Sequence, residues 1–257
     1  MKDTARLAEM VLAARLDGKM PAPTREWYGN TDIDDAYQVQ EKVLKEMLRR
    51  RGGKIIGRKV GCTNQAARDL LGLDGPFHGA LLSVTATESP ARIAKDDYPF
   101  IILEPEFALR IGSPLRPGGG THTAESVADA VDAIVPAVEI VSSCHDEWTD
   151  AGPALLIADN GSSYGWVRGE PVTDWDLEML TNVTVSLIVG AHRVASGNAA
   201  NVDGGPLGVL AWVANRLPLE PGDYVSTGTA TSVHFAERGD TVVAHFGPLG
   251  QVEIEIS

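Results

Sequence analysis

Two glutamates, Glu104 and Glu106, are separated by one residue in the otherwise apolar run of residues 103–109. The run is typical of a β-strand, where alternate side chains share a face, so we expect these side chains to lie roughly 6.5–7 Å apart on one face. Two like charges on a half-buried face repel each other and lose hydration unless a positive group lies between them. A hard divalent cation would satisfy both carboxylates.

A third glutamate, Glu139, interrupts a second apolar run at residues 135–141. Three carboxylates suit Mg²⁺ or Mn²⁺, which take oxygen ligands and keep positions open for water and substrate. The alternative is a solvated strand face. That alternative is favoured for one glutamate in a strand, but three glutamates on apolar strands favour the metal site.

Lys59 lies near the end of a predicted strand at residues 54–61. It could reach an anionic substrate, or carry a proton if burial beside a metal lowered its pKa. The alternative is a surface lysine, the usual fate of this residue type. Two polar strand ends, residues 158–161 and 226–229, could offer hydrogen-bond donors to a carboxylate or form simple turns.

Residues 161–165 match the G-x-S-x-G pattern of a serine hydrolase, in which a helix must follow the serine. Here a strand pattern follows and Pro171 ends it, so the hydrolase interpretation is disfavoured. His78 has no histidine at ligand spacing, which favours a surface or core histidine over a metal ligand.

The 257 residues, 44% hydrophobic and 22% charged, fit one large domain or one domain with a small appendage. A formal net charge of −13 argues against a nucleic-acid partner. Cys62 and Cys144 have no metal-binding spacing, so we expect a reduced, cytoplasmic protein. No apolar run approaches the ~18–20 residues of a membrane span.

Helical and strand periodicities alternate along the chain and predict an α+β protein with a curved, barrel-like sheet and few helices. The predicted helices cover residues 4–17, a segment starting at residues 32–35 and ending at Gly52, a segment N-capped by Thr63, a segment N-capped by Thr123 with Val127, Val131 and Ile134 on one face, and a segment opened by Pro206. Residues 241–246 and 251–256 predict a final hairpin.

From about Lys59 onward, the chain resembles the 2-keto-4-pentenoate hydratase / 2-oxohepta-3-ene-1,7-dioate hydratase family of the fumarylacetoacetate hydrolase superfamily. The motifs that carry the resemblance are Lys-Val-Gly-Cys-Thr at 59–63, Leu-Gly-Leu-Asp-Gly-Pro at 71–76, Glu-Pro-Glu at 104–106, Pro-Ala-Val-Glu at 136–139, Ala-Asp-Asn at 158–160 and Ser-Thr-Gly at 226–228. Their order and spacing are specific for the superfamily and much less specific for the reaction.

The resemblance implies a mixed β-roll core of the fumarylacetoacetase C-terminal type with a small N-terminal helical region. We expect an N-terminal α/β region at residues 1–80, packed on a catalytic domain at 81–257. The resemblance further implies a homo-oligomer that holds Mg²⁺ or Mn²⁺ and acts on a small molecule, and it leaves open an association with a neighbouring pathway enzyme. The implied metal ligands are Glu104, Glu106 and Glu139.

The implied reaction adds water to a 2-hydroxy-2,4-dienoate, a product of aromatic-ring breakdown, and yields a 4-hydroxy-2-oxo acid. The alternatives are decarboxylation of a 2-oxo-3-enedioate, C–C hydrolysis or tautomerisation, and, in a different class, a non-catalytic metal-binding partner subunit. The residues expected to act on substrate are Lys59, Asp159 and His78 in catalysis and Ser162, Thr227 and Gly228 in binding. Many family members have an acid where Phe77 stands, and His78 is the expected substitute.

Overall fold

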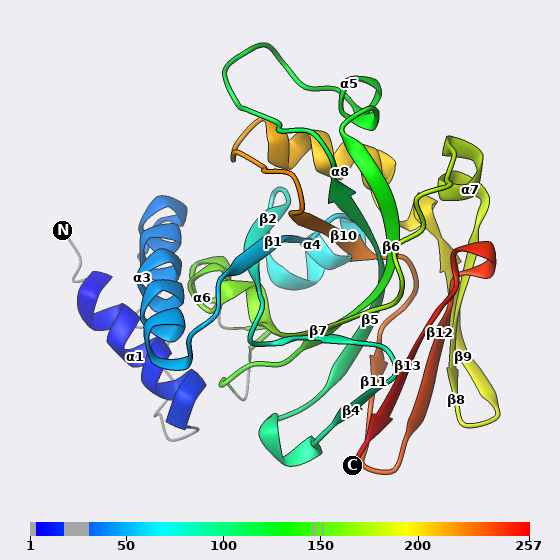
Figure 1. Cartoon of the computed structure of the whole chain (residues 1–257). Helices are drawn as coiled ribbons and strands as arrows, with labels where there is room; N and C mark the ends of the chain where they lie inside the picture. The colour runs from blue at the N-terminus through cyan, green and yellow to red at the C-terminus, as the bar shows by residue number, and fades with distance from the viewer. Residues whose placement is uncertain (1–3, 18–30, 146–147, 151) are drawn as a thin grey trace.

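Two β-sheets lie at the centre of the computed structural model, which describes residues 4–17, 31–145, 148–150 and 152–257 (Figure 1). The strands of the larger sheet are β1 (Ile55–Gly61), β2 (Phe77–Leu82), β3 (Ala86–Glu88), β5 (Ile102–Ile111), β6 (Val131–Val141), β7 (Ser163–Arg168), β10 (Tyr224–Thr229) and β11 (His234–Phe235). They follow the order β2-β1-β10-β5-β6-β7-β3, and β11 pairs with β5. β1 and β10 are parallel, whereas β5 and β6 are antiparallel, so the sheet is mixed.

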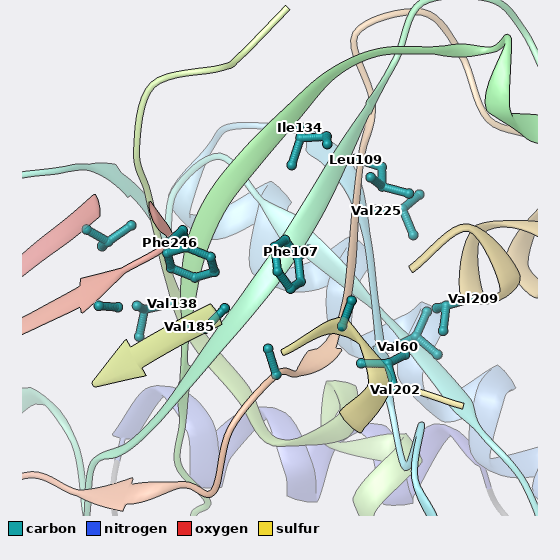
Figure 2. Close-up of a cluster of buried hydrophobic side chains, with 14 of the residues drawn as sticks. Val60, Phe107, Leu109, Ile134, Val138, Val185, Val202, Val209, Val225 and Phe246 are labelled. Carbon is teal, nitrogen blue, oxygen red and sulfur yellow. The ribbon is translucent and has the colours of Figure 1, made fainter. Parts of the chain in front are cut away.

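The smaller sheet packs beside the larger one and closes the core. Its strands are β4 (Ala91–Ile93), β8 (Thr184–Val189), β9 (His192–Asn198), β12 (Thr241–His245) and β13 (Gln251–Ile256). Its order is β4-β13-β12-β8-β9, and the predicted final hairpin is confirmed as β12 and β13. The apolar side chains between the sheets include Phe107 and Phe246, which meet edge to face with ring centroids 5.5 Å apart (Figure 2).

A second apolar cluster joins the N-terminal helices to the larger sheet. It is built from α1 (Thr4–Asp17), α3 (Ile33–Arg51), α6 (Pro153–Ala158) and the buried residues of β2 (Figure 1). The predicted start and end of α3 are confirmed: the Asp32 side chain accepts a hydrogen bond from the Asp35 amide at 2.7 Å, and Gly52 is the C-cap. α1 packs on α3 and α3 packs on α6, which leads into the polar segment at residues 159–163.

The other helices are α4 (Gln65–Leu71), α5 (Ala124–Ala128), α7 (Leu177–Asn182) and α8 (Gly205–Ala214). The N-cap of α4 is Asn64 and not the predicted Thr63. The predicted helix over Val127, Val131 and Ile134 is wrong, because α5 stops at Ala128 and β6 begins at Val131. β6 is buried almost throughout, and a continuous apolar run fits a helical period as well as a strand.

The α+β class with a curled, barrel-like sheet and few helices is confirmed. The division at residue 80 stays a prediction; β2 runs across that position and pairs with β1 in the larger sheet. Across the described ranges, none of the helices combines the length and the apolarity needed to cross a membrane.

Candidate metal centre and active site

The three predicted carboxylates meet on neighbouring strands. Glu104 and Glu106 project from the same face of β5, as alternation requires, and Glu139 on β6 lies directly opposite Glu104 in the register. One carboxylate oxygen from each lies within 4.8 Å of the others. The structure therefore brings together all three predicted metal ligands.

Burial makes this group unstable without a positive charge. Glu106 and Glu139 are 0% and 1% exposed, and one oxygen of each, Oε1, has no hydrogen-bond partner among the described residues. Burial, together with repulsion from Glu139, raises the pKa of Glu104 to about 7. The same two causes, with repulsion from Glu104 added, raise the pKa of Glu106 well above its ordinary value. Unpartnered oxygens in an acidic, buried group fit a hard divalent cation.

Ser226 on β10 fixes the orientation of Glu106. Its hydroxyl donates to Glu106 Oε2 and accepts a 3.2 Å hydrogen bond from the indole N–H of Trp166. All three side chains are buried. The sequence pattern points to Thr227 and Gly228 and not to Ser226, because only the folded structure shows that the Ser226 hydroxyl donates to a glutamate.

Lys59 reaches the same group from β1. Its Nζ donates a 2.5 Å hydrogen bond to the Gly161 carbonyl and lies 3.4 Å from Glu139 Oε1. The ring of Phe77 lies beside it, with its centroid 5.0 Å from Nζ. Lys59 is 3% exposed, so the surface alternative is wrong, and its role toward substrate stays a prediction.

The Gly161 carbonyl belongs to a turn with an unusual backbone. Asn160, Gly161 and Ser162 have φ values of 55°, 61° and 59°, three consecutive residues in the left-handed region. For each non-glycine residue this conformation costs about 1–2 kcal/mol. At Gly161 a Cβ would lie 2.3 Å from the Phe77 ring and 2.7 Å from Lys59 Cε, so the close approach of Lys59 requires glycine there.

A cavity of about 70 Å³ opens onto Glu104 and Lys59. Its polar wall includes Lys59, Glu104, Ser162 and Thr229. Its apolar wall is formed by Ala67, Leu71, Phe77, Trp148 and Leu156. Gly228 completes the lining; its φ is 96° and a Cβ there would lie 1.9 Å from Thr63 Oγ1, so a side chain would not fit.

Three predicted site residues are not brought to this cavity. His78 pairs with Val60 and faces the opposite side of the sheet from Lys59, where it stacks on Tyr37 at a centroid distance of 4.3 Å. Burial, with nearby Arg58 and Arg216, lowers the pKa of His78 to about 4. His78 therefore does not lie where it could replace an acid at Phe77.

The other two residues bond elsewhere in the protein. Thr227 donates to the Phe107 carbonyl at 2.8 Å. The Asp159 carboxylate accepts a 2.8 Å hydrogen bond from Arg15, a residue of α1 that the sequence analysis did not select. Nothing in the pattern of α1 distinguishes Arg15 from a solvent-exposed arginine.

The serine-hydrolase motif has no elbow. β7 starts at Ser163, so a strand and not a helix follows the serines, and the sequence-based rejection is confirmed. Ser162 lies in the cavity wall next to Gly161, which agrees with its predicted place at the substrate site.

Comparisons with known proteins agree with this architecture. Residues 77–257 match the profile described as fumarylacetoacetate (FAA) hydrolase C-terminal. The chain is 32% identical to 2-keto-4-pentenoate hydratase 1 of Dechloromonas aromatica over 97% of this chain and 95% of that protein. It is 31% identical to 2-keto-4-pentenoate hydratase of Burkholderia vietnamiensis, covering 96% and 95% of the two chains.

A solved structure shares the whole fold. It is 4-oxalocrotonate decarboxylase from Pseudomonas putida G7, complexed with magnesium and adipate, with a TM-score of 0.90, 24% identity, and coverage of 99% of this chain and 97% of that chain. The likeness extends over the N-terminal helices as well as the sheets. The profile match over residues 77–257 and the hydratase relatives that are similar over nearly their full length establish that this chain belongs to the fumarylacetoacetate hydrolase family.

Proposed function

We propose that this protein is a divalent-metal-dependent hydratase that adds water to a 2-hydroxy-2,4-dienoate and forms a 4-hydroxy-2-oxo acid. The observation that carries the proposal is the buried group of Glu104, Glu106 and Glu139, which faces a small cavity together with Lys59. The relatives named 2-keto-4-pentenoate hydratase, similar over nearly their full length, support the reaction.

Glu104, Glu106 and Glu139 would hold Mg²⁺ or Mn²⁺. The bound ion supplies Lewis acidity, which polarises a 2-oxo acid and stabilises negative charge on its 2-oxygen. Ser226 keeps the Glu106 carboxylate in one orientation. Because Glu139 also lies beside Lys59, the lysine and the metal ligands act on adjacent atoms of one substrate.

Lys59 is assigned to proton transfer. Ketonisation of the dienol removes the proton of the 2-hydroxyl and adds a proton at C5, which leaves an α,β-unsaturated ketone. Water then adds its oxygen at C4 and a proton at C3. We assign Lys59 Nζ, which donates to the Gly161 carbonyl and lines the cavity, to removal of the proton of the 2-hydroxyl. Ser162, in the same wall, is assigned to the substrate carboxylate.

The cavity lining favours a substrate with one carboxylate. Apolar side chains form one wall, and Lys59 is the one basic residue of the lining in the part of the chain that the structure describes. A second carboxylate against Leu71, Phe77 or Trp148 would lose its hydration without a charge partner. This observation favours the hydratase over a decarboxylase acting on a 2-oxo-3-enedioate.

The reaction can be tested by NMR with the Mg²⁺-loaded protein and 2-hydroxypenta-2,4-dienoate, using an EDTA-treated sample as the control. Formation of 4-hydroxy-2-oxopentanoate only in the presence of metal is expected. A parallel sample with 2-oxo-3-hexenedioate is expected to release no CO₂. Release of CO₂ there, without hydration of the monoacid, would assign the decarboxylase reaction instead. Inertness toward both acids in the metal-loaded protein would favour the non-catalytic subunit.

Assembly into a homo-oligomer is part of the proposal. Large apolar side chains stand exposed on several elements, among them Leu70 at 64%, Phe235 at 62% and Leu177 at 58%. Light scattering coupled to gel filtration would measure the subunit number. The cytoplasmic location and the pathway partner stay predictions, which cell fractionation and affinity capture from the native host would test.

A further inference from the structure

One arginine of the N-terminal helix reaches the strained turn at residues 160–162. Arg15 Nη1 donates to the Asp159 carbonyl at 2.7 Å and to Asp159 Oδ1 at 2.8 Å, and Nη2 donates to the Ser163 carbonyl. The Arg15 and Asp159 side chains are 3% and 1% exposed. The guanidinium also lies 3.9 Å from the centroid of the Tyr164 ring.

The carbonyls bound by Arg15 bracket the turn. Asp159 precedes it and Ser163 follows it, so one planar group fixes the distance between the two ends. On the opposite side, the Asn160 side chain accepts from the Ala80 amide at 2.7 Å and donates to the Ala80 carbonyl at 3.0 Å. Three left-handed residues persist in a row only where surrounding contacts determine them in this way.

The turn supplies the hydrogen-bond acceptor of Lys59. The Gly161 carbonyl accepts the hydrogen bond from Lys59 Nζ, and Ser162 lines the cavity. A rotation of the Gly161 peptide would remove the acceptor and free the lysine to swing toward Glu139. Arg15 therefore acts on the active site in two steps, first along the backbone from Asp159 and Ser163 to Gly161, and then through the hydrogen bond that Lys59 Nζ donates to the Gly161 carbonyl.

We propose that Arg15 is a positioning residue for Lys59: by clamping the Asp159 and Ser163 carbonyls it holds the Gly161 carbonyl where it fixes Nζ in the cavity wall. The alternative is that Arg15 only attaches α1 to the sheet. A buried ion pair generally adds little stability over apolar residues of the same volume, so attachment alone does not explain a buried arginine. The turnover measurement that tests this proposal rests on the proposed function, whereas the acetylation of Lys59 does not.

The variants are Arg15→Ala, Arg15→Lys and a matched control, Leu7→Ala. Leu7 is 2% exposed on the same helix and belongs to the second apolar cluster, so its loss loosens α1 while every hydrogen bond from Arg15 to the turn is kept. The first readout does not require substrate: acetylation of Lys59 by acetic anhydride, measured by peptide mass spectrometry against the exposed Lys54 in the same chain. The second is turnover of the dienoate, and the third is Mn²⁺ affinity measured by EPR.

Arg15→Ala is expected to raise the acetylation of Lys59 relative to Lys54 about tenfold and to lower kcat about 100-fold, the loss typical of a misplaced catalytic group. KM and Mn²⁺ affinity are expected to stay within about threefold of wild type, because β5 and β6 carry the metal ligands. Added guanidinium should restore part of the kcat of Arg15→Ala. Arg15→Lys, which keeps the charge but not the two-pronged contact, should fall between wild type and Arg15→Ala.

Leu7→Ala is expected to lower Tm while keeping Lys59 protected and kcat unchanged. If Arg15→Ala and Leu7→Ala behave alike, with lower Tm but full Lys59 protection, the positioning role is overturned. If Arg15→Ala does not fold, Arg15→Lys decides, since full protection and full kcat in that variant would also overturn it. If wild-type protein shows no hydratase activity, the acetylation result still tests the clamp while the proposed function fails separately.

Discussion

The hydrogen bond from Ser226 to Glu106 gives the sharpest quantitative prediction. Ser226→Ala removes the only side-chain donor that the described residues supply to Glu106 and leaves the Trp166 N–H without its acceptor. A hydrogen bond to a charged group contributes about 1.5–3 kcal/mol. If most of that orients the carboxylate toward the cation, Mn²⁺ affinity should fall about 10- to 100-fold, the range found when groups that support metal ligands are removed.

The assay is an EPR titration of Mn²⁺ into metal-free protein, with thermal unfolding of the same samples. Thr227→Val is the matched control, because Thr227 is the next residue of β10, is equally buried, and bonds a carbonyl instead of a glutamate. It is expected to lose about 1 kcal/mol of stability and no metal affinity. Folded Ser226→Ala protein that binds Mn²⁺ as tightly as wild type would refute the reasoning.

Three further outcomes are expected. Lys59→Met should lower kcat at least about 100-fold while Mn²⁺ binding, followed by EPR, is kept; near-normal turnover would remove the lysine from proton transfer. Glu106→Gln should raise the Tm of the metal-free protein, because it removes a buried carboxyl whose ionised form is opposed by burial and by Glu139 and Glu104, and should abolish the rise in Tm on adding Mg²⁺; a lower metal-free Tm would contradict this. The pKa of His78 lies near 4 against an ordinary value near 6.5, so the folded state holds the neutral ring; its contribution of about 1–3 kcal/mol is present above pH 6.5 and is lost as pH falls toward 4. Urea unfolding across that pH range should show that the free energy of unfolding falls more steeply with acid in wild type than in His78→Phe. Parallel plots of this free energy against pH for the two proteins would contradict the assignment.

The shared face of Glu104 and Glu106 could be predicted from sequence, because it follows from the alternation of side chains along a strand. Alternation alone places Glu104 and Glu106 on one face, and the structure confirms it. The position of Glu139 opposite Glu104 depends on the register of β5 with β6, which no local pattern determines. The motifs and their order indicated the family, and the comparisons confirmed it.

The contacts that position the site could not be predicted. Ser226 cannot be told from Thr227 in the sequence, because both are small hydroxyl residues at one strand end and only the folded structure shows which of them donates to a glutamate. Arg15 is 144 positions from Asp159 and has no local signal. The chemistry of His78 suggests a site residue, but His78 is the next residue of β2 after Phe77. Its side chain therefore points to the face opposite Lys59. The sequence shows which residue types are present, whereas the direction in which a side chain points depends on how the strands pair in the sheet.

The depth at which the three carboxylates are buried determines the order in which a cation and an organic acid can bind. Glu104 lines the cavity, while Glu106 and Glu139 lie behind it and are almost fully buried. An organic acid seated in the cavity therefore covers the approach to the deeper two ligands. In steady-state terms, we therefore expect ordered addition, with the cation first and the acid second, and a bound product should slow dissociation of the cation. Exchange of the cation should slow as the acid concentration rises, so the cation should dissociate most slowly during turnover.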